Sequence, residues 1–151
     1  MLVENKPGVL HNISGLFSRR GFNIDSLAVG TTEDPKLSRM TIVVDGEEHS
    51  IEQVTKQLHK LINVIKISEL DPKESVEREL ALFKVNAAAG RRNEIISIAD
   101  IFRSKIVDVS SNTVTIEATG TSDKIQAIEE LLKSYGIIEI VRTGKISISR
   151  K

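Results

Sequence analysis

The sequence predicts an α+β protein made of two tandem ferredoxin-like domains, each with the element order βαββαβ. Three observations support this prediction. Apolar residues recur at helical spacing in some segments and alternate with polar residues in others. The order strand, helix, strand, strand, helix, strand fits the first half of the 151 residues and fits the second half again. Between the halves lies a charged stretch that opens with Asp71-Pro72.

The elements of the first half follow from apolar spacing and from the residues that punctuate it. Pro7 suits the first turn of a helix and Gly21 suits its C-terminal stop, while Pro35 cannot donate to a strand ladder and therefore marks a turn. The expected elements are a strand at Met1–Glu4, a helix with Val9, Ile13, Leu16 and Phe17, strands at 22–31 and 37–45, a helix with Ile51, Val54, Leu58, Leu61 and Ile62, and a strand at 63–70.

The second half repeats this order and adds a last strand. Asn112 lies between two β-branched runs and predicts a hairpin, Gly136 predicts the end of a helix, and residues 143–145 predict a turn. The expected elements are a strand at 79–87, a helix with Ile95, Ile98, Ala99 and Phe102, strands at 106–109 and 114–117, a helix with Ile125, Ile128, Leu131 and Leu132, and strands at 137–142 and 146–149.

These elements divide the chain into a first domain at 1–70, a linker at 71–78 and a second domain at 79–151. In each domain two helices are expected to cover one face of the sheet. Residues 24–29 and 40–44 carry apolar side chains toward both faces. A second copy of the chain is the simplest cover for the other face or for an open sheet edge, so we expect a homodimer.

Composition excludes several classes of function. The chain has 21 Lys+Arg and 21 Asp+Glu, and this balance argues against a surface that tracks nucleic acid or acidic lipid. The absence of Cys excludes disulfides, thiol nucleophiles and cysteine-ligated metal sites. No apolar run is long enough to span a bilayer, and the N-terminus lacks the features of a signal peptide. We expect a cytoplasmic protein.

A search for catalytic chemistry finds little. His11, His49 and His59 lack the spacing of a helical metal site, and we interpret them as solvated residues. The sequence contains no Gly-x-x-x-x-Gly-Lys-Ser/Thr loop, no Gly-x-Gly-x-x-Gly and no Gly-x-Ser-x-Gly. The strand at 38–45 has no aromatic residue on which an RNA base could stack. Neither an independent active site nor nucleic-acid binding is expected.

The turn at 5–10 is the most informative segment, because it leads from a strand directly into a helix. Glycine early in a helix costs up to about 1 kcal/mol relative to alanine, so Gly8 indicates an unusual backbone angle or a close approach to the backbone. A helix N-terminus offers unpaired N–H groups that suit a carboxylate. Asn5, and Asn23 at the head of the next strand, could add amides to such a site. The alternatives are an ordinary turn and a strand-entry cap.

At these residues the chain resembles the regulatory (small) subunits of acetolactate synthase, also called acetohydroxyacid synthase. The resemblance covers nearly the whole chain, and the combination of runs is specific. The matching runs are 4–10 (ENKPGVL), 15–27 (GLFSRRGFNIDSL), 37–42 (LSRMTI), 76–85 (VERELALFKV), 107–109 (VDV), 119–124 (TGTSDK) and 142–150 (RTGKISISR).

The resemblance implies that residues 1–70 form an ACT domain, a small amino-acid-sensing module that dimerises. Members of this family have no catalysis of their own. They bind the large catalytic subunit, raise its activity and confer feedback inhibition, most often by valine, in valine, leucine and isoleucine biosynthesis. Thiamine diphosphate, Mg and FAD are expected on the catalytic subunit only, and no cofactor, nucleic acid or membrane is expected on this chain.

The resemblance also implies an effector site shared between two protomers. One protomer would supply the turn and its apolar walls, and the other would complete the pocket. The implied effector residues are Asn5, Gly8, Val9 and Leu10 of one protomer and Asn23 and Ile24 of the other. In one respect this chain departs from the family, which usually has several more residues before Glu4. Either the natural start lies upstream of Met1, or the first strand is clipped.

An alternative from another class is a stand-alone ACT-domain sensor that acts on transcription or on another enzyme. Such a protein usually needs a DNA-binding element, and no helix-turn-helix fits here without consuming a strand. Co-purification distinguishes the two hypotheses, because a thiamine-diphosphate enzyme would travel with a regulatory subunit.

Overall fold

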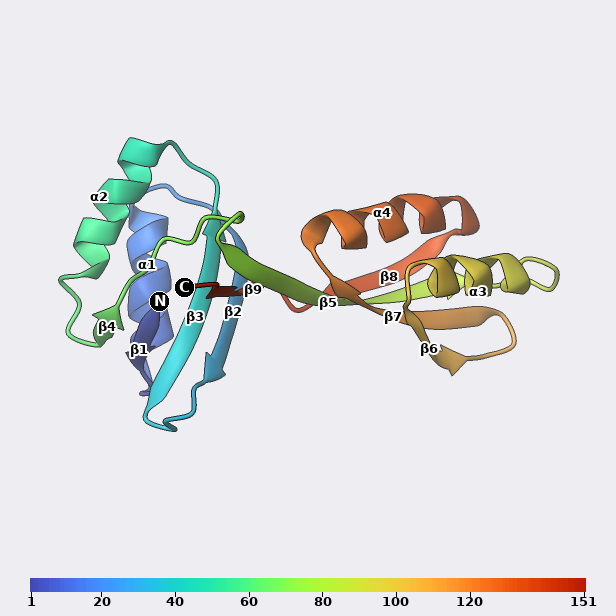
Figure 1. Cartoon of the computed structure of the whole chain (residues 1–151), viewed down its shortest axis with the longest axis horizontal. Helices are drawn as coiled ribbons and strands as arrows, with labels where there is room; N and C mark the ends of the chain where they lie inside the picture. The colour runs from blue at the N-terminus through green and yellow to red at the C-terminus, as the bar shows by residue number, and fades with distance from the viewer. The chain divides into compact units, whose positions relative to one another are not determined.

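The computed structural model describes the backbone of residues 1–151 and every side chain except those of Glu48 and His49. The chain divides into two compact units. The first unit comprises Met1–Val76 together with Lys145–Lys151, and the second comprises Glu77–Gly144. The labels of Figure 1 follow the chain order of the elements.

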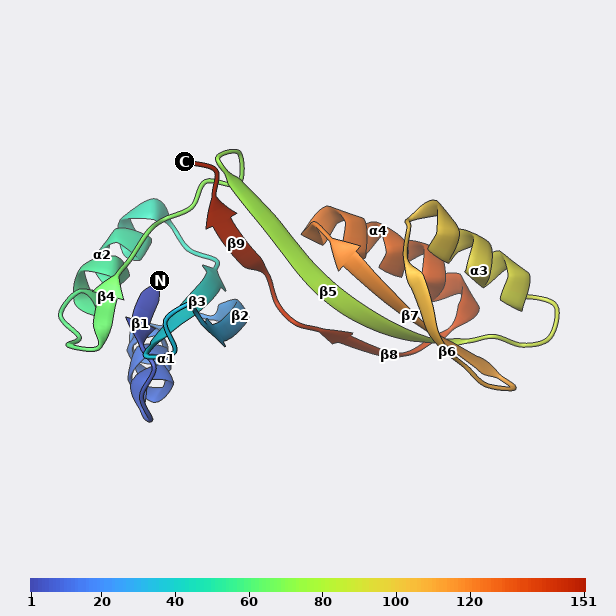
Figure 2. The same ribbon diagram turned by 60° about the horizontal axis from the view of Figure 1, so that its bottom comes forward.

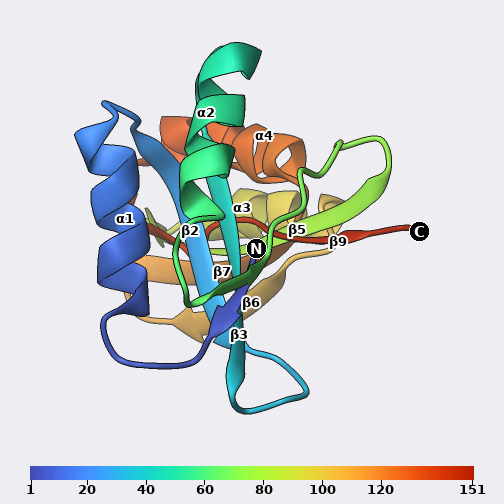
Figure 3. The ribbon, with the colours of Figure 1, turned by 90° about the vertical axis from the view of Figure 1, so that its left-hand side faces the viewer.

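The first unit is built on an antiparallel sheet with the strand order β2-β3-β1-β4. The short β1 is central, because it pairs antiparallel with both β3 and β4. Helices α1 and α2 cover one face of this sheet, as Figure 3 shows. The elements are β1 (Leu2–Glu4), α1 (Val9–Arg19), β2 (Ile24–Thr31), β3 (Leu37–Val44), α2 (Glu48–Leu58) and β4 (Val64–Lys66).

The second unit repeats this topology with the strand order β6-β7-β5-β8. Helices α3 and α4 lie on one face of its sheet (Figure 2). The elements are β5 (Ser75–Asn86), α3 (Arg92–Ile101), β6 (Lys105–Val109), β7 (Thr113–Gly120), α4 (Ser122–Leu132), the 3₁₀ turn η1 (Lys133–Tyr135), β8 (Ile137–Arg142) and, returning to the first unit, β9 (Ile146–Ser149). The predicted fold class, with two βαββαβ units, is confirmed.

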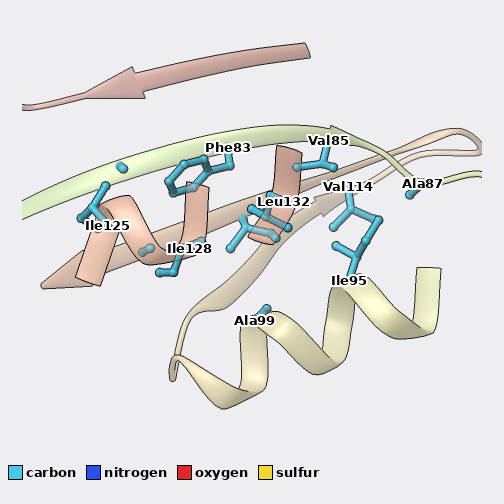
Figure 4. Packing of buried hydrophobic residues seen from close by; sticks show 12 residues of the cluster. Phe83, Val85, Ala87, Ile95, Ala99, Val114, Ile125, Ile128 and Leu132 are labelled. Carbon is cyan, nitrogen blue, oxygen red and sulfur yellow. The ribbon is translucent and has the colours of Figure 1, made fainter. Parts of the chain in front are cut away.

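Each unit has its own hydrophobic core, formed by the helix faces that the sequence spacing predicts. In the first unit Val3, Ile13 and Met40 are at most 2 % exposed. In the second unit the ring of Phe83 is fully buried beneath α4, and Figure 4 shows it beside Ile125 and Ile128. With few aromatic residues available, packed aliphatic side chains supply most of this burial.

Three sequence predictions need correction. The second helix ends at Leu58, so Leu61 and Ile62 lie beyond it; Leu61 still packs against the core, whereas Ile62 is 93 % exposed. The strand expected at 63–70 is limited to β4, Val64–Lys66. The strand expected from 79 begins earlier, at Ser75. The first difference arises because turns after a helix can keep apolar residues at helical spacing without continuing the helix. The second arises because β4 pairs with β1, which has only three residues.

The last two strands have the predicted bounds, and both pair with the same strand. Both β8 and β9 pair with β5, so the turn at 143–145 does not fold them onto one another. The backbone N–H of Lys145 donates to Ser26 Oγ (2.8 Å), which attaches the start of this C-terminal segment to β2. Among the described residues, no helix is long and apolar enough to cross a membrane.

Candidate effector site

The turn between β1 and α1 presents open backbone at the start of a helix. Gly8 is the N-cap of α1 and adopts a left-handed conformation, with φ 84° and ψ −11°. No atom lies within 4 Å of the position that a Cβ would take there, so the space beside Gly8 is open. No side chain caps α1. The Val9 N–H donates to the Lys6 carbonyl (3.4 Å), so the N–H groups of the next two residues, Leu10 and His11, are the ones that an anion could use.

Asn5 is fixed to the loop that joins β2 and β3. Its backbone N–H donates to the Lys36 carbonyl (2.8 Å), and its side-chain Nδ2 donates to the Pro35 carbonyl (3.0 Å). One amide hydrogen of Asn5 is thus engaged within the protomer. The side-chain oxygen of Asn5 can still accept a hydrogen bond.

Glu4, the last residue of β1, is held from the opposite side. Asn63 Nδ2 donates to Glu4 Oε2 (2.6 Å), and Glu4 N–H donates to the Asn63 carbonyl (2.9 Å). Lys6 Nζ lies 3.2 Å from the same carboxylate oxygen. The hydrogen bond from Asn63, and then that from Lys6, hold the pKa of Glu4 below its ordinary value.

Of the three residues predicted as apolar walls, Val9, Leu10 and Ile24, the two at the turn differ in exposure. Val9 is 4 % exposed and packs in the core, whereas Leu10 is 42 % exposed and lies free beside the turn. A cavity of about 10 Å³ lies under the first turn of α1; its lining residues are Val9, Asn12, Ile13, Leu61, Asn63 and Val64. This volume holds about one water molecule, so the cavity cannot enclose an amino acid.

Asn23 and Ile24 lie at the other end of the sheet. Asn23 Nδ2 donates to Asp25 Oδ1 (2.7 Å), and Ile24 packs against the core at the start of β2. Ile24 opposes Val44 on β3. At about 3.3 Å per residue, the eight residues of β2 separate Ile24 from Thr31 by roughly 23 Å.

The strand register fixes which candidates come together. Glu4, just before the turn, opposes Leu37 on β3, and the next β3 residue, Ser38, opposes Thr31. The turn therefore lies at the Thr31 end of β2, and Ile24 lies at the far end. Within one protomer the structure brings Asn5, Gly8 and Leu10 together and keeps Asn23 and Ile24 apart from them.

The structure describes the side chains of two of the three histidines. His11 and His59 are exposed, and the side chain of His49 lies outside the described residues. Among the residues that the structure describes, no group of three or more His, Cys, Asp or Glu side chains could hold a metal ion.

Comparison with known proteins gives matches over nearly the entire chain. The profile of the family described as "AHAS small subunit-like ACT domain" matches residues 1–66, and that of "Small subunit of acetolactate synthase" matches residues 78–151. The acetolactate synthase small subunit of Mycolicibacterium smegmatis is 59 % identical over 150 residues, which cover 99 % of this chain and 88 % of that protein. The chain belongs to the acetolactate synthase small-subunit family.

Other small subunits agree with this assignment. The probable acetolactate synthase small subunit of Archaeoglobus fulgidus is 56 % identical, covering 99 % of this chain and 94 % of that protein. The crystal structure of the acetolactate synthase small subunit from Thermotoga maritima superimposes with a TM-score of 0.92 at 46 % identity, covering 100 % of this chain and 94 % of the other. The resemblance inferred from sequence is confirmed, and the chain is a regulatory small subunit, distinct from the catalytic subunit.

Sequence analysis of this small subunit missed the contacts that hold the turn. Glu4 and Asn63 are 59 residues apart, and Asn5 and Pro35 are 30 apart. Both contacts depend on strand order in the sheet. Their local sequence carries no signal for them, apart from the position of Glu4 and Asn5 at the end of a strand.

Proposed function

We propose that this chain raises the activity of the thiamine-diphosphate-dependent catalytic subunit of acetolactate synthase in the cytoplasm and confers feedback inhibition by a branched-chain amino acid, with valine the first candidate. The observation that carries the effector part of the proposal is the left-handed, uncovered Gly8 at the N-terminus of α1. In a family of regulatory subunits for branched-chain biosynthesis, such a turn suits the carboxylate of an amino acid.

The effector would bind through its zwitterion and its aliphatic side chain. Its carboxylate would accept hydrogen bonds from the N–H groups of the first turn of α1, where the helix dipole favours negative charge. Asn5 Oδ1 would accept from the ammonium group. Leu10, which is 42 % exposed, would contact the aliphatic side chain of the effector. Val9 is buried and would hold the first turn of α1 against the core.

A second protomer would complete the site through the edge strand β2. This strand has eight residues and lies at one end of the sheet order, whereas β4, at the other end, has three. An open edge of that length favours pairing with another chain. If two β2 strands pair antiparallel about a twofold axis near their middle, Asn23 and Ile24 of the partner subunit approach the Thr31 end of the first protomer. That end carries the turn.

Inhibition would then be linkage between effector binding and the state of the catalytic subunit. An effector that bridges two protomers changes activity only if it binds one arrangement of the dimer better than another. A coupling free energy of about 1–3 kcal/mol corresponds to a change of about 5- to 150-fold. Thiamine diphosphate, Mg and FAD would stay on the catalytic subunit, where the reaction takes place.

The effector site can be tested with a pair of substitutions at Gly8. Both Asp and Asn tolerate a positive φ better than other side chains, and the space beside Gly8 is open, so the two variants differ mainly in charge. We expect Gly8→Asp to abolish inhibition by valine, because its carboxylate would repel the effector's. Gly8→Asn should retain a measurable response. The measurement is acetolactate formation by the reconstituted enzyme against valine concentration.

Two results would contradict this proposal. If Gly8→Asp responds to valine as the unmodified chain does, the effector does not bind at this turn. If the chain fails to co-purify with a catalytic subunit and changes no acetolactate activity, the proposed regulation itself is wrong.

A further inference from the structure

Two hydrogen bonds hold the end of β1, and neither is part of the proposed effector site. Glu4 N–H donates to the Asn63 carbonyl (2.9 Å), and Asn63 Nδ2 returns a hydrogen bond to Glu4 Oε2 (2.6 Å). We call this pair the Glu4–Asn63 clamp. It joins the last residue of β1 to the segment between α2 and β4, and the effector turn begins one residue after it.

We propose that the Glu4–Asn63 clamp sets the affinity of the effector site by holding the turn 5–8 in the arrangement that binds. The inference rests on the proposed function and deepens it, since it identifies Glu4 and Asn63 as positioning residues for that site. Neither residue is required to touch the effector.

The turn needs such support because its own residues give it little. Residues 5–8 are all exposed, and Gly8 gives the backbone freedom that other residues lack. On the β3 side the turn is tied by Asn5 to the carbonyls of Pro35 and Lys36. On the β4 side the tie is the Glu4–Asn63 clamp. A segment held on both sides loses less conformational entropy when a ligand binds.

The clamp also connects the turn to the packing beneath α1. Asn63 and its neighbours Leu61 and Val64 line the same small cavity as Val9 and Asn12 of α1. A shift of the α2–β4 segment therefore displaces both ends of the effector turn, at Glu4 and at the first turn of α1. This is why we assign the clamp to positioning and not only to the stability of β1.

Within the clamp, the amide hydrogen bond outweighs the neighbouring ion pair. The Asn63 bond joins an amide to a carboxylate and is charge-assisted. The Lys6 side chain that pairs with Glu4 is 64 % exposed, and exposed ion pairs contribute little. The hydrogen bond of Asn63 is also the first cause of the lowered pKa of Glu4.

The first experiment measures binding of L-valine, L-leucine and L-isoleucine to the full chain by titration calorimetry. We expect Asn63→Ala to raise the dissociation constant about tenfold, as for a turn that occupies its competent arrangement about a tenth of the time. Glu4→Gln keeps an oxygen acceptor for Asn63 and should largely restore affinity, whereas Glu4→Ala should not. Asn93→Ala, which removes an exposed amide from α3 in the second unit, is the control and should bind as the unmodified chain does.

The second experiment adds a charge to the clamp. Asn63→Asp would place two carboxylates together, and one of them would hold a proton more tightly. The other charged groups near Glu4 are Lys6 on the turn and Arg39 and Lys66, which oppose Leu2 from β3 and β4. We expect Asn63→Asp to bind valine at least as weakly as Asn63→Ala at pH 8, where both carboxylates are ionised and repel each other.

Several outcomes would overturn this inference. Suppose that Gly8→Asp binds no effector but that Asn63→Ala and Glu4→Ala bind it as tightly as the unmodified chain does. The proposed function would then stand, and the clamp would have no part in it. Binding by Asn63→Asp at pH 8 that is as tight as that of the unmodified chain would have the same consequence. If the unmodified chain binds none of the three amino acids, the proposed function fails, and this inference fails with it.

Discussion

At the residue scale, the first helix of each half ends in the same backbone motif, but with a different residue in the left-handed position. Helix α1 ends with Gly21 at φ 74°, where Phe22 N–H donates to the Phe17 carbonyl (3.0 Å). Helix α3 ends with Arg103 at φ 53°, where Ser104 N–H donates to the Ala99 carbonyl (2.8 Å). Both patterns are Schellman motifs, which need a left-handed residue just past the helix. Only the first uses the residue that adopts this conformation without cost.

This difference predicts a stabilising substitution. Arg103→Gly should raise the free energy of unfolding of the second unit by about 1 kcal/mol, because an arginine in the left-handed region is strained. Arg103→Ala, which removes the side chain but keeps the strain, is the control and should give no such gain. Thermal unfolding followed by circular dichroism checks both, and a lower melting temperature for Arg103→Gly would contradict the argument.

Residue-scale reasoning from sequence also found the effector turn but not its supports. Pro7-Gly8 after a strand is a local signal, and Gly8 does have the unusual backbone angle that its position predicts. Asn63 has no such signal, since its contact with Glu4 exists only because β1 and β4 lie side by side. Local chemistry can be predicted from neighbours in sequence, whereas a positioning contact requires the strand order.

At the element scale, the order and positions of the helices and strands were predicted well, and the errors lie at the end of α2, in the extent of β4 and at the start of β5. The bounds of β8 and β9 are those expected, and β6 and β7 form the hairpin predicted around Asn112. The end of α2 was wrong because the turns after it place Leu61 where a helix would have placed it. Apolar spacing reports burial, and burial alone does not distinguish a last helical turn from the turns that follow it.

The core of the second unit gives a prediction at this scale. Phe83 on β5 is fully buried between the sheet and the helices, and it is the largest side chain of that cluster. Phe83→Ala should lower the free energy of unfolding by about 3–5 kcal/mol through the cavity that it leaves. Phe83→Leu, closer in volume, should cost about 1.5 kcal/mol or less. Denaturant unfolding measures both free energies. If Phe83→Ala lost no more than Phe83→Leu, the core would have closed over the cavity, and the argument from cavity size would be wrong.

At the scale of the whole molecule, the effector residues suggest how two copies of the chain would meet. One protomer holds Asn5 and Gly8 at one end of the sheet and Asn23 at the other. The cavity under α1 has room for about one water molecule. A site that used all three residues would therefore require two chains, and we propose that the edge strand β2 provides the pairing.

The last prediction tests that edge. Val29 lies on β2 with 47 % of its side chain exposed, so a change there leaves the core intact. Val29→Lys should prevent the pairing of two β2 strands, since a lysine on an edge strand disfavours association and would lie within the paired segment. We expect a monomer by analytical ultracentrifugation and the loss of valine binding in the same variant. Val29→Thr, similar in shape and uncharged, should remain a dimer that binds valine. A Val29→Lys dimer with unchanged affinity would mean that the two chains meet elsewhere and that the partner subunit's Asn23 has no part in the site.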